Sequence, residues 1–338
     1  MILSKHLASS SNMPHEVTAA LPTGTWVADP AIVGVPLRAP AYAQLTELGV
    51  IAVQGPDAAA FLHAQLTNDV LHLDTQCVQM NGYCTPKGRL LAVFDNWRDA
   101  ERVYLQLPRE LLAPTLKRLS MYVLRRKAQL IDDSENWVCL GLAGPGAAAL
   151  TADWPRDAAT RLVRLRDGIR AVERFLLITR RAALAAVDAK LASAHPVDAA
   201  AWWWTQIDAA IPNVFAATVE RFVPQMINLD VLGAVNFKKG CYPGQEVVAR
   251  SQYLGKLRRR MQLAHVAGET RAGADVYAAG SGQPVGTVVM AATAPEGGMD
   301  LLFECPLDRL QEPLFANAPQ GPRLLLRSLP YELRDPTA

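Results

Sequence analysis

Hydrophobic positions from residue 48 onward fall into short apolar runs, alternating stretches and helically spaced sets. Period-2 alternation is typical of strands, and apolar residues three or four apart are typical of one face of a helix. Asp57, after a Gly-Pro turn, can cap a following helix. In chain order the pattern predicts a strand at 50–53, a helix at 58–65, strands at 76–84, 89–97 and 102–107, and a helix at 109–122.

A second copy of this pattern follows. Residues 138–150 resemble residues 50–61, with a Gly-Pro turn after the strand in both, and residues 174–184 resemble residues 102–112. Two matches in the same order favour a duplicated unit over a chance similarity of alanine-rich helices. A strand–helix–strands–helix unit used twice predicts an α+β fold of tandem ferredoxin-like subdomains.

The pattern of hydrophobic and turn-forming residues changes again near the end of the chain. From Met261 onward, short strands separated by Gly- and Pro-rich turns predict a small antiparallel β-barrel. The predicted division is an N-terminal extension of low order (1–40), a first subdomain (41–135), its repeat (136–200), a segment packed on both that carries the candidate site (201–260), and the barrel (261–335).

Composition narrows the class of protein. Half of the 338 residues are hydrophobic and the net charge is +2, so any basic function must be local. The five cysteines are scattered and form no Cys-x-x-Cys pair, which predicts a reducing compartment without a disulfide framework or a self-contained zinc site. No apolar run reaches about 18 residues, and no signal-peptide core is visible. We therefore expect a cytoplasmic protein with no membrane span.

The strongest candidate for chemistry is Cys241, in the Lys-Lys-Gly-Cys-Tyr-Pro-Gly-Gln-Glu run of residues 238–246. Glycine on either side allows close backbone approach, and Pro243 suits the first turn of a helix. A thiol at such a turn, near lysines and helix-terminal N–H groups, is a candidate for thiolate chemistry. The alternative is a buried, inert cysteine in a tight turn.

Two further features have open interpretations. Trp202, Trp203 and Trp204 lie about 100° apart on a helix and cannot all face one side of it, so at least one should look away from the core. They form either an aromatic wall for a flat ligand or ordinary packing. Residues 238–260 hold seven Lys or Arg and one acid, which indicates either a polyanion site or a solvated basic linker. Nucleotide-binding glycine loops, His-Glu-x-x-His and Gly-x-Ser-x-Gly are absent from the sequence, so nucleotide-dependent and zinc-hydrolase functions have no support.

Residues 239–246 resemble the signature Lys-Gly-Cys-Tyr-x-Gly-Gln-Glu of the YgfZ family, folate-binding proteins related to the T-protein (aminomethyltransferase) of the glycine cleavage system. The resemblance covers roughly residues 41–333. It implies three subdomains in a ring around a central hole that binds tetrahydrofolate or a derivative. It also implies a role in assembling or maintaining iron–sulfur enzymes, including one that modifies tRNA.

The same resemblance implies roles for individual residues. Cys241 is the essential thiol, a nucleophile, redox sensor or transient cluster ligand, with Lys239 beside it. Trp202 matches an aromatic wall of the ligand site, and Asp208 matches a Glu that holds the pterin, since a carboxylate can accept two N–H bonds. The other expected folate contacts are Gln225, Asn228, Tyr242, Gln245, Glu246 and Arg250. The implied partners are folate, iron–sulfur client or assembly proteins and a weak tRNA contact, and no resident metal site is expected.

One departure weakens the analogy with the T-protein. T-proteins carry an Asp, thought to activate the folate nitrogen, in the strand after the first hairpin. Here the aligned position is apolar, at Ala92 and Val93, and Asp95 is displaced along the strand. General-base chemistry needs a carboxylate within about 3 Å of that nitrogen. We therefore do not expect aminomethyltransferase turnover, but that activity, a demethylase activity and a tRNA-binding module on residues 250–260 stay open as alternatives.

Overall fold

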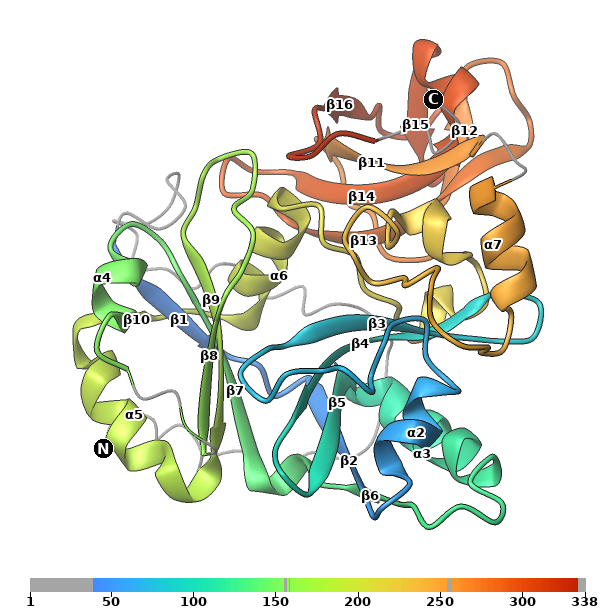
Figure 1. Ribbon diagram of the computed structural model, residues 1–338. Helices are drawn as coiled ribbons and strands as arrows, with labels where there is room; N and C mark the ends of the chain where they lie inside the picture. Colours follow the sequence, from blue (N-terminus) through green and yellow to red (C-terminus); the bar gives the residue numbers. More distant parts are fainter. Residues whose placement is uncertain (1–38, 155–156, 158, 254–256, 334–338) are drawn as a thin grey trace.

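The computed structural model describes residues 39–333 except 155–156, 158 and 254–256. The predicted low-order extension at 1–40 therefore lies almost entirely outside the described residues. Within them the fold is mixed α/β, with three sheets around a central helix (Figure 1). This confirms the expected combination of helices and largely antiparallel strands.

The first sheet has the strand order β3-β4-β5-β2-β6, and every pairing in it is antiparallel. Its strands are β2 (Leu48–Gln54), β3 (Gln79–Cys84), β4 (Leu90–Arg98), β5 (Arg102–Pro108) and β6 (Gln129–Asp132). Helices α2 (Ala58–His63) and α3 (Leu112–Met121) pack beside it. The predicted elements are confirmed, although α2 is two residues shorter than predicted and residues 109–111 form a 3₁₀ turn before α3.

The second sheet has the order β10-β1-β7-β9-β8. Its elements are β1 (Ala41–Gln44), β7 (Trp137–Ala143), β8 (Thr160–Arg164), β9 (Arg174–Arg180) and β10 (His195–Pro196), with α4 (Ala147–Thr151) and α5 (Leu184–Lys190). In both sheets the strand before the first helix pairs with the strand before the second, β2 with β5 and β7 with β9. The predicted duplication requires this pairing. Strand β1 pairs with β7, so residues 41–44 lie in the sheet of the second unit.

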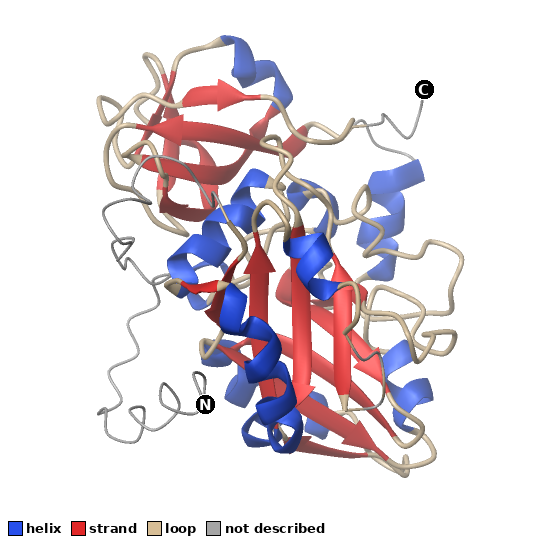
Figure 2. Ribbon diagram, turned by 90° about the vertical axis from the view of Figure 1, so that its left-hand side faces the viewer, coloured by secondary structure: helices blue, strands red, loops and turns tan. Residues whose placement is uncertain are grey.

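The third sheet is the predicted C-terminal β unit. It is a single curled sheet of six strands in the order β15-β12-β13-β14-β11-β16. In Figure 2 it lies at the upper end of the molecule, above the other two sheets. Its strands are β11 (Arg259–Val266), β12 (Asp275–Ala278), β13 (Pro284–Thr293), β14 (Met299–Pro306), β15 (Leu314–Ala316) and β16 (Leu325–Arg327). The predicted Gly-rich turns join β12 to β13 and β13 to β14.

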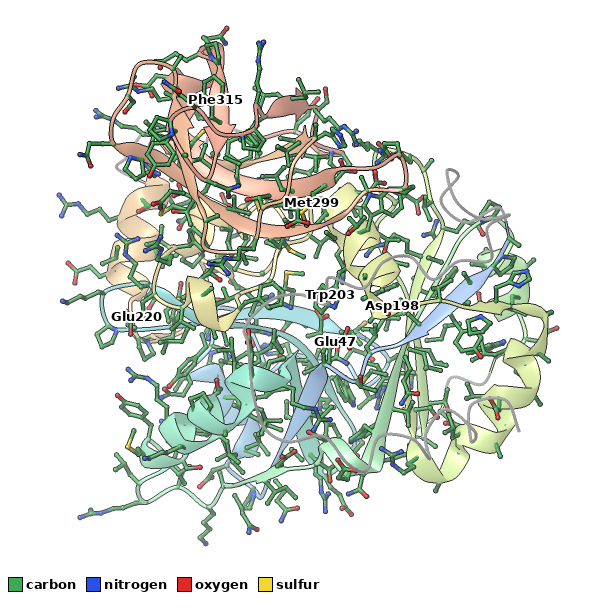
Figure 3. The ribbon with its side chains drawn as sticks, turned by 180° about the vertical axis from the view of Figure 1, so that it is seen from behind. Glu47, Asp198, Trp203, Glu220, Met299 and Phe315 are labelled. Atoms are coloured by element: carbon green, nitrogen blue, oxygen red, sulfur yellow. The ribbon has the colours of Figure 1, made fainter. Side chains whose placement is uncertain are left out.

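Helix α6 (Ala199–Asp208) connects these parts. The Asp198 carboxylate caps it by accepting from the Ala200 N–H at 2.8 Å. Its three tryptophans are all buried, as a helix apolar on every side requires. They face different neighbours: Trp202 covers Gly141 of β7, Trp203 donates to Glu47 (Figure 3), and Trp204 donates to Asp300 of β14. The three rings point in different directions, as predicted. All three nevertheless lie in one buried apolar cluster, so the expectation that one of them looks away from the core is wrong.

A single cluster of buried apolar side chains extends from the first sheet through α6 to the third, including Ile51, Phe94, Trp203, Met261 and Met290. Smaller clusters fill the second and third sheets. None of the helices described is long and apolar enough to cross a membrane.

Candidate functional site

Lys239 fixes the start of the cysteine segment to the first sheet. Its ammonium donates to the carbonyl oxygens of Leu66 at 2.6 Å and Asn68 at 3.1 Å, and also to that of His63 at the end of α2. Carbonyls at a helix end lack partners within the helix, and a lysine can satisfy them. Burial lowers the pKa of Lys239 to about 8, partly offset by Asp69.

Tyr242 and Gly244 fix the segment on the other side of the cysteine. Tyr242 is buried, and the Lys239 ammonium lies 5.1 Å from its ring centroid. Gly244 has φ of 82°, and a Cβ there would lie 2.5 Å from the Thr85 carbonyl oxygen. Glycine alone tolerates both conditions, so this residue lets the segment pack directly on the β3–β4 hairpin. The predicted close backbone approach is confirmed at Gly244.

Cys241 lies exposed between these two fixed points. Burial raises the pKa of Cys84, Cys139 and Cys305 to about 12, which keeps them protonated and unreactive. Cys77 is the other exposed thiol. The expectation of a buried Cys241 is therefore wrong, while the reactivity of its thiol stays a prediction.

A histidine lies beside the cysteine segment. His63 Nε2 is 3.6 Å from the position that a Cβ would take on Gly240, and His63 Nδ1 is 3.1 Å from Asp69 Oδ1. Burial and the Lys239 charge lower the pKa of His63. His63 has no helix-spaced histidine partner in the sequence, and the cysteine segment beside it comes from a different part of the chain, so the sequence pattern did not indicate it.

Two amides expected to contact folate hold the segment that precedes Cys241. Gln225, in the 3₁₀ turn Pro224–Ile227, donates to the Val248 carbonyl of helix α7 (Gln245–Tyr253) at 2.7 Å. Asn228 donates to the Met261 carbonyl of β11 at 3.0 Å and accepts from its N–H at 3.3 Å. Both side chains are fully buried. Gln245, Glu246 and Arg250 follow on α7, where the latter two are exposed.

A second group of polar side chains lies at the centre of the molecule. Asp95 of β4 faces the same side as Val93, and its burial raises its pKa to about 6, although Arg174 opposes the shift. Arg174 of β9 is fully buried. It donates to Thr205 Oγ1 at 3.0 Å and to the Arg166 carbonyl at 2.9 Å, and its guanidinium lies 5.2 Å from the Trp202 ring.

Ala92 and Val93 are buried and apolar as predicted, but the strand does present a carboxyl two residues further along. From the sequence alone, Asp95 stood out only as a displaced residue, and Arg174 did not stand out at all. An arginine directly before the apolar run of residues 175–178 was the available signal. Burial of such a charge requires partners, and these come from α6 and the loop after β8.

Comparison with known proteins identifies the family. No protein-family model matches the chain. The tRNA-modifying protein YgfZ of Vibrio vulnificus (strain CMCP6) is 30% identical over 305 residues, which cover 87% of this chain and 93% of that protein. The chain belongs to the YgfZ family. Another protein of that name, from Photorhabdus laumondii, is 34% identical over 226 residues, 64% of this chain and 68% of that protein.

A solved structure shares the fold of this YgfZ-family chain. The crystal structure of the glycine cleavage system aminomethyltransferase T from Bartonella henselae matches with a TM-score of 0.71. The match covers 97% of this chain and 96% of that chain at 18% sequence identity. The arrangement of sheets around α6 is thus the aminomethyltransferase fold.

Asp208, the carboxylate expected to hold the pterin, is part of a charged network in this YgfZ-family chain. It accepts from Arg170 Nη1 at 2.6 Å and from the Arg170 N–H at 3.2 Å. Arg170 and Arg327 both contact Glu296 and Asp300. His265 joins Asp300 at 2.9 Å, so His265, Glu296 and Asp300 have the spacing of metal ligands. Two guanidinium groups already neutralise these carboxylates, which disfavours a cation there.

The basic tract at residues 250–260 is partly neutralised. Arg259 pairs with Glu304 at 2.8 Å and Arg260 with Asp230 at 2.6 Å, and Arg260 is buried. Arg250 and Arg258 are exposed, and Lys256 lies outside the described residues. The count of charges in the sequence therefore overstated the free positive charge of this tract.

Proposed function

We propose that this protein is a cytoplasmic, tetrahydrofolate-binding accessory factor for iron–sulfur enzymes, including tRNA-modifying ones, with Cys241 as its reactive thiol. The observation that carries the proposal is an exposed Cys241 fixed on both sides, by Lys239 and by Tyr242 with Gly244, in a chain of the YgfZ family. A thiol fixed in this way offers sulfur chemistry at a defined place on the surface. Three of the four other thiols, Cys84, Cys139 and Cys305, are buried.

Folate is proposed to bind at the centre, with the three subdomains arranged as a ring around it. Asp95 is a partly exposed carboxyl there, and Arg174 links it electrostatically to Trp202 and Asp208. A carboxyl group suits the amino-pyrimidine edge of a pterin, because it can accept two N–H bonds. Gln225, Asn228 and the α7 residues would act by shaping the wall between this centre and Cys241.

Folate binding is tested by titrating tetrahydrofolate into the protein and following tryptophan fluorescence together with calorimetry. We expect quenching, and a lower affinity in Asp95→Asn and Trp202→Phe. Asp95→Asn keeps the shape of the side chain but removes its charge, and Trp202→Phe keeps an aromatic ring of smaller size. Unchanged affinity in both variants would remove the proposed centre as the folate site.

The thiol role is tested by complementation in a deletion strain, with the activity of an iron–sulfur tRNA-modifying enzyme as the readout. Cys241→Ala is expected to fail, and Cys77→Ala, the matched exposed cysteine, is expected to restore activity fully. Full restoration by Cys241→Ala would contradict the proposal.

A second candidate function, aminomethyltransfer, is favoured by one observation. Asp95 has a pKa of about 6, which suits a general base working near neutral pH. Methylene transfer from an aminomethylated carrier protein to tetrahydrofolate decides between the two functions. Turnover that Asp95→Asn abolishes would establish the transferase, whereas folate binding without turnover supports the accessory role.

A further inference from the structure

An open depression lies at one end of the first sheet. Strand β2 ends there, and β5 and β6 begin there; Figure 1 labels these strands. Its volume is about 710 Å³. Three loops form it: the Gly55-Pro56 turn before α2, the β4–β5 turn at residues 98–102, and the segment 126–129 that leads into β6. It is separate from the central polar group and from the Cys241 segment.

Positive charge is concentrated in this depression. Arg98, Arg102, Arg126 and Lys127 line it, against one acid, Glu101. Within the described ranges none of the four cations has a carboxylate within ion-pair distance, in contrast to Arg259 and Arg260 of the basic tract. A group of uncompensated cations over one concave surface attracts anions. Three of the four are arginines, whose planar guanidinium groups match phosphate oxygens.

The loops that carry these cations are held in place. In the β4–β5 turn, Asp99 accepts from the N–H groups of Glu101 at 2.9 Å and Arg102 at 2.8 Å, and from the Tyr104 hydroxyl at 2.6 Å. On the other side, the Asp57 carboxylate accepts from the Lys127 N–H at 2.7 Å. Because the backbone is fixed before binding, less conformational entropy is lost when a ligand binds.

A single short helix, α2, connects the depression to the point where the cysteine segment is attached. Ala58 and Ala59, in the first turn of α2, line the depression, and the His63 carbonyl at the other end accepts from Lys239. A six-residue helix is about 9 Å long. An anion in the depression therefore lies about one helix length from the point where the cysteine segment is attached.

We propose that this depression binds the phosphate groups of an extended anion, the backbone of single-stranded RNA. A free polyphosphate carries the same chemistry and is the other source that the experiment distinguishes. The site does not depend on folate binding or on the reactivity of Cys241, so it can be tested apart from the proposed function.

The test uses the full-length protein and a labelled single-stranded RNA oligonucleotide, with binding followed by fluorescence anisotropy over a range of salt concentrations. Arg102→Ala/Lys127→Ala is expected to weaken binding at least tenfold at low salt. Each lost phosphate contact lowers the slope of log K against log salt by about 0.7, so the slope should fall by about 1.4. Neither side chain makes an ion pair in the described structure, and thermal unfolding checks that the variant folds.

The matched control is Arg271→Ala/Arg323→Ala, two exposed arginines of the C-terminal region that likewise lack an ion pair in the part of the chain described. It should bind RNA as the wild type does. If tripolyphosphate displaces the labelled RNA, the site also binds free polyphosphate. If tripolyphosphate does not displace it, the site is specific for the RNA backbone. Equal weakening in both double variants, wild-type affinity in Arg102→Ala/Lys127→Ala, or no binding of either probe would overturn the proposal.

Discussion

At the scale of single residues, burial shifts the pKa values of Lys239 and Asp95 in opposite directions. Burial lowers the pKa of the Lys239 ammonium to about 8 and raises that of the Asp95 carboxyl to about 6, because both lose hydration of their charged forms. Lys239 recovers part of this loss through three carbonyl oxygens. For Asp95, the charge of Arg174 lowers the pKa and so opposes part of the shift that burial causes.

Replacing Lys239 by Ala should therefore destabilise the protein. Carbonyl oxygens of residues 63, 66 and 68 would lose their donor, and a buried polar group left without a partner costs about 1–3 kcal/mol. Urea unfolding should show a decrease of about that size. The neighbouring Lys238 is exposed, so Lys238→Ala should leave the free energy of unfolding almost unchanged. Equal stability of the two variants would show that the three carbonyls do not need the ammonium.

Asp95 should make stability depend on pH between about 4 and 6. Its folded-state pKa is raised to about 6, so the folded protein holds the proton more tightly than the unfolded chain. Stability from this group is complete below about pH 4 and is lost as the pH rises through 6. The Asp95→Asn variant lacks the ionisable group and should not show this loss. The free energy of unfolding of the variant, minus that of the wild type, should therefore be about 2–3 kcal/mol larger at pH 7 than at pH 4.

Urea unfolding at both pH values measures this difference. Asp308→Asn, at an exposed carboxylate, is the control and should show no such change. A stability difference between Asp95→Asn and wild type that is the same at pH 4 and pH 7 would contradict the raised pKa.

At the scale of elements, helix α6 depends on a single glycine in β7. A Cβ on Gly141 would lie 2.2 Å from the Trp202 ring, far inside contact distance. Overpacking of a core typically costs about 1–3 kcal/mol, so Gly141→Ala should lower the melting temperature and change the tryptophan emission. At Gly282 a Cβ would meet nothing within 4 Å, so Gly282→Ala is a matched control. Similar melting temperatures for the two variants would mean that α6 can shift at little cost.

Elements were predictable from the sequence where their signal is local. Alternation and Gly-Pro turns located β2, β5, β7 and β9, because both features act within a few residues. The place of β1 was not predictable, since its partner β7 lies about a hundred residues away and pairing over that distance depends on tertiary contacts.

The candidate site shows the same limit. Motif residues identified the Cys241 segment. Its neighbour His63 comes close to it only through folding, and the same is true of the electrostatic influence of Arg174 on Asp95. The count of charges suggested a polyanion site at residues 238–260. It could not show that Glu304 and Asp230 occupy two of those arginines, or that the cations of residues 98–127 gather in one depression.

At the scale of the whole molecule, Arg170 joins three parts of the fold. It lies in the loop between β8 and β9 of the second sheet, and it contacts Asp208 at the end of α6 and Asp300 on β14 of the third sheet. Both carboxylates are almost completely buried. The network thus holds the curled sheet against the rest of the molecule, in addition to the apolar cluster around α6.

Removal of Arg170 should therefore weaken the whole assembly. Arg170→Met leaves the buried Asp208 carboxylate without its guanidinium partner, and breaking one side of a buried ion pair costs about 3–5 kcal/mol. Arg309→Met, which breaks the exposed pair with Glu312, should cost at most about 1 kcal/mol. Adding Asp208→Asn to Arg170→Met should recover part of the loss, because the buried charge is then gone. Calorimetric unfolding of these three variants and the wild type measures these differences. An Arg170→Met variant as stable as Arg309→Met, or one that Asp208→Asn fails to improve, would show that the apolar contacts of α6 hold the third sheet without this network.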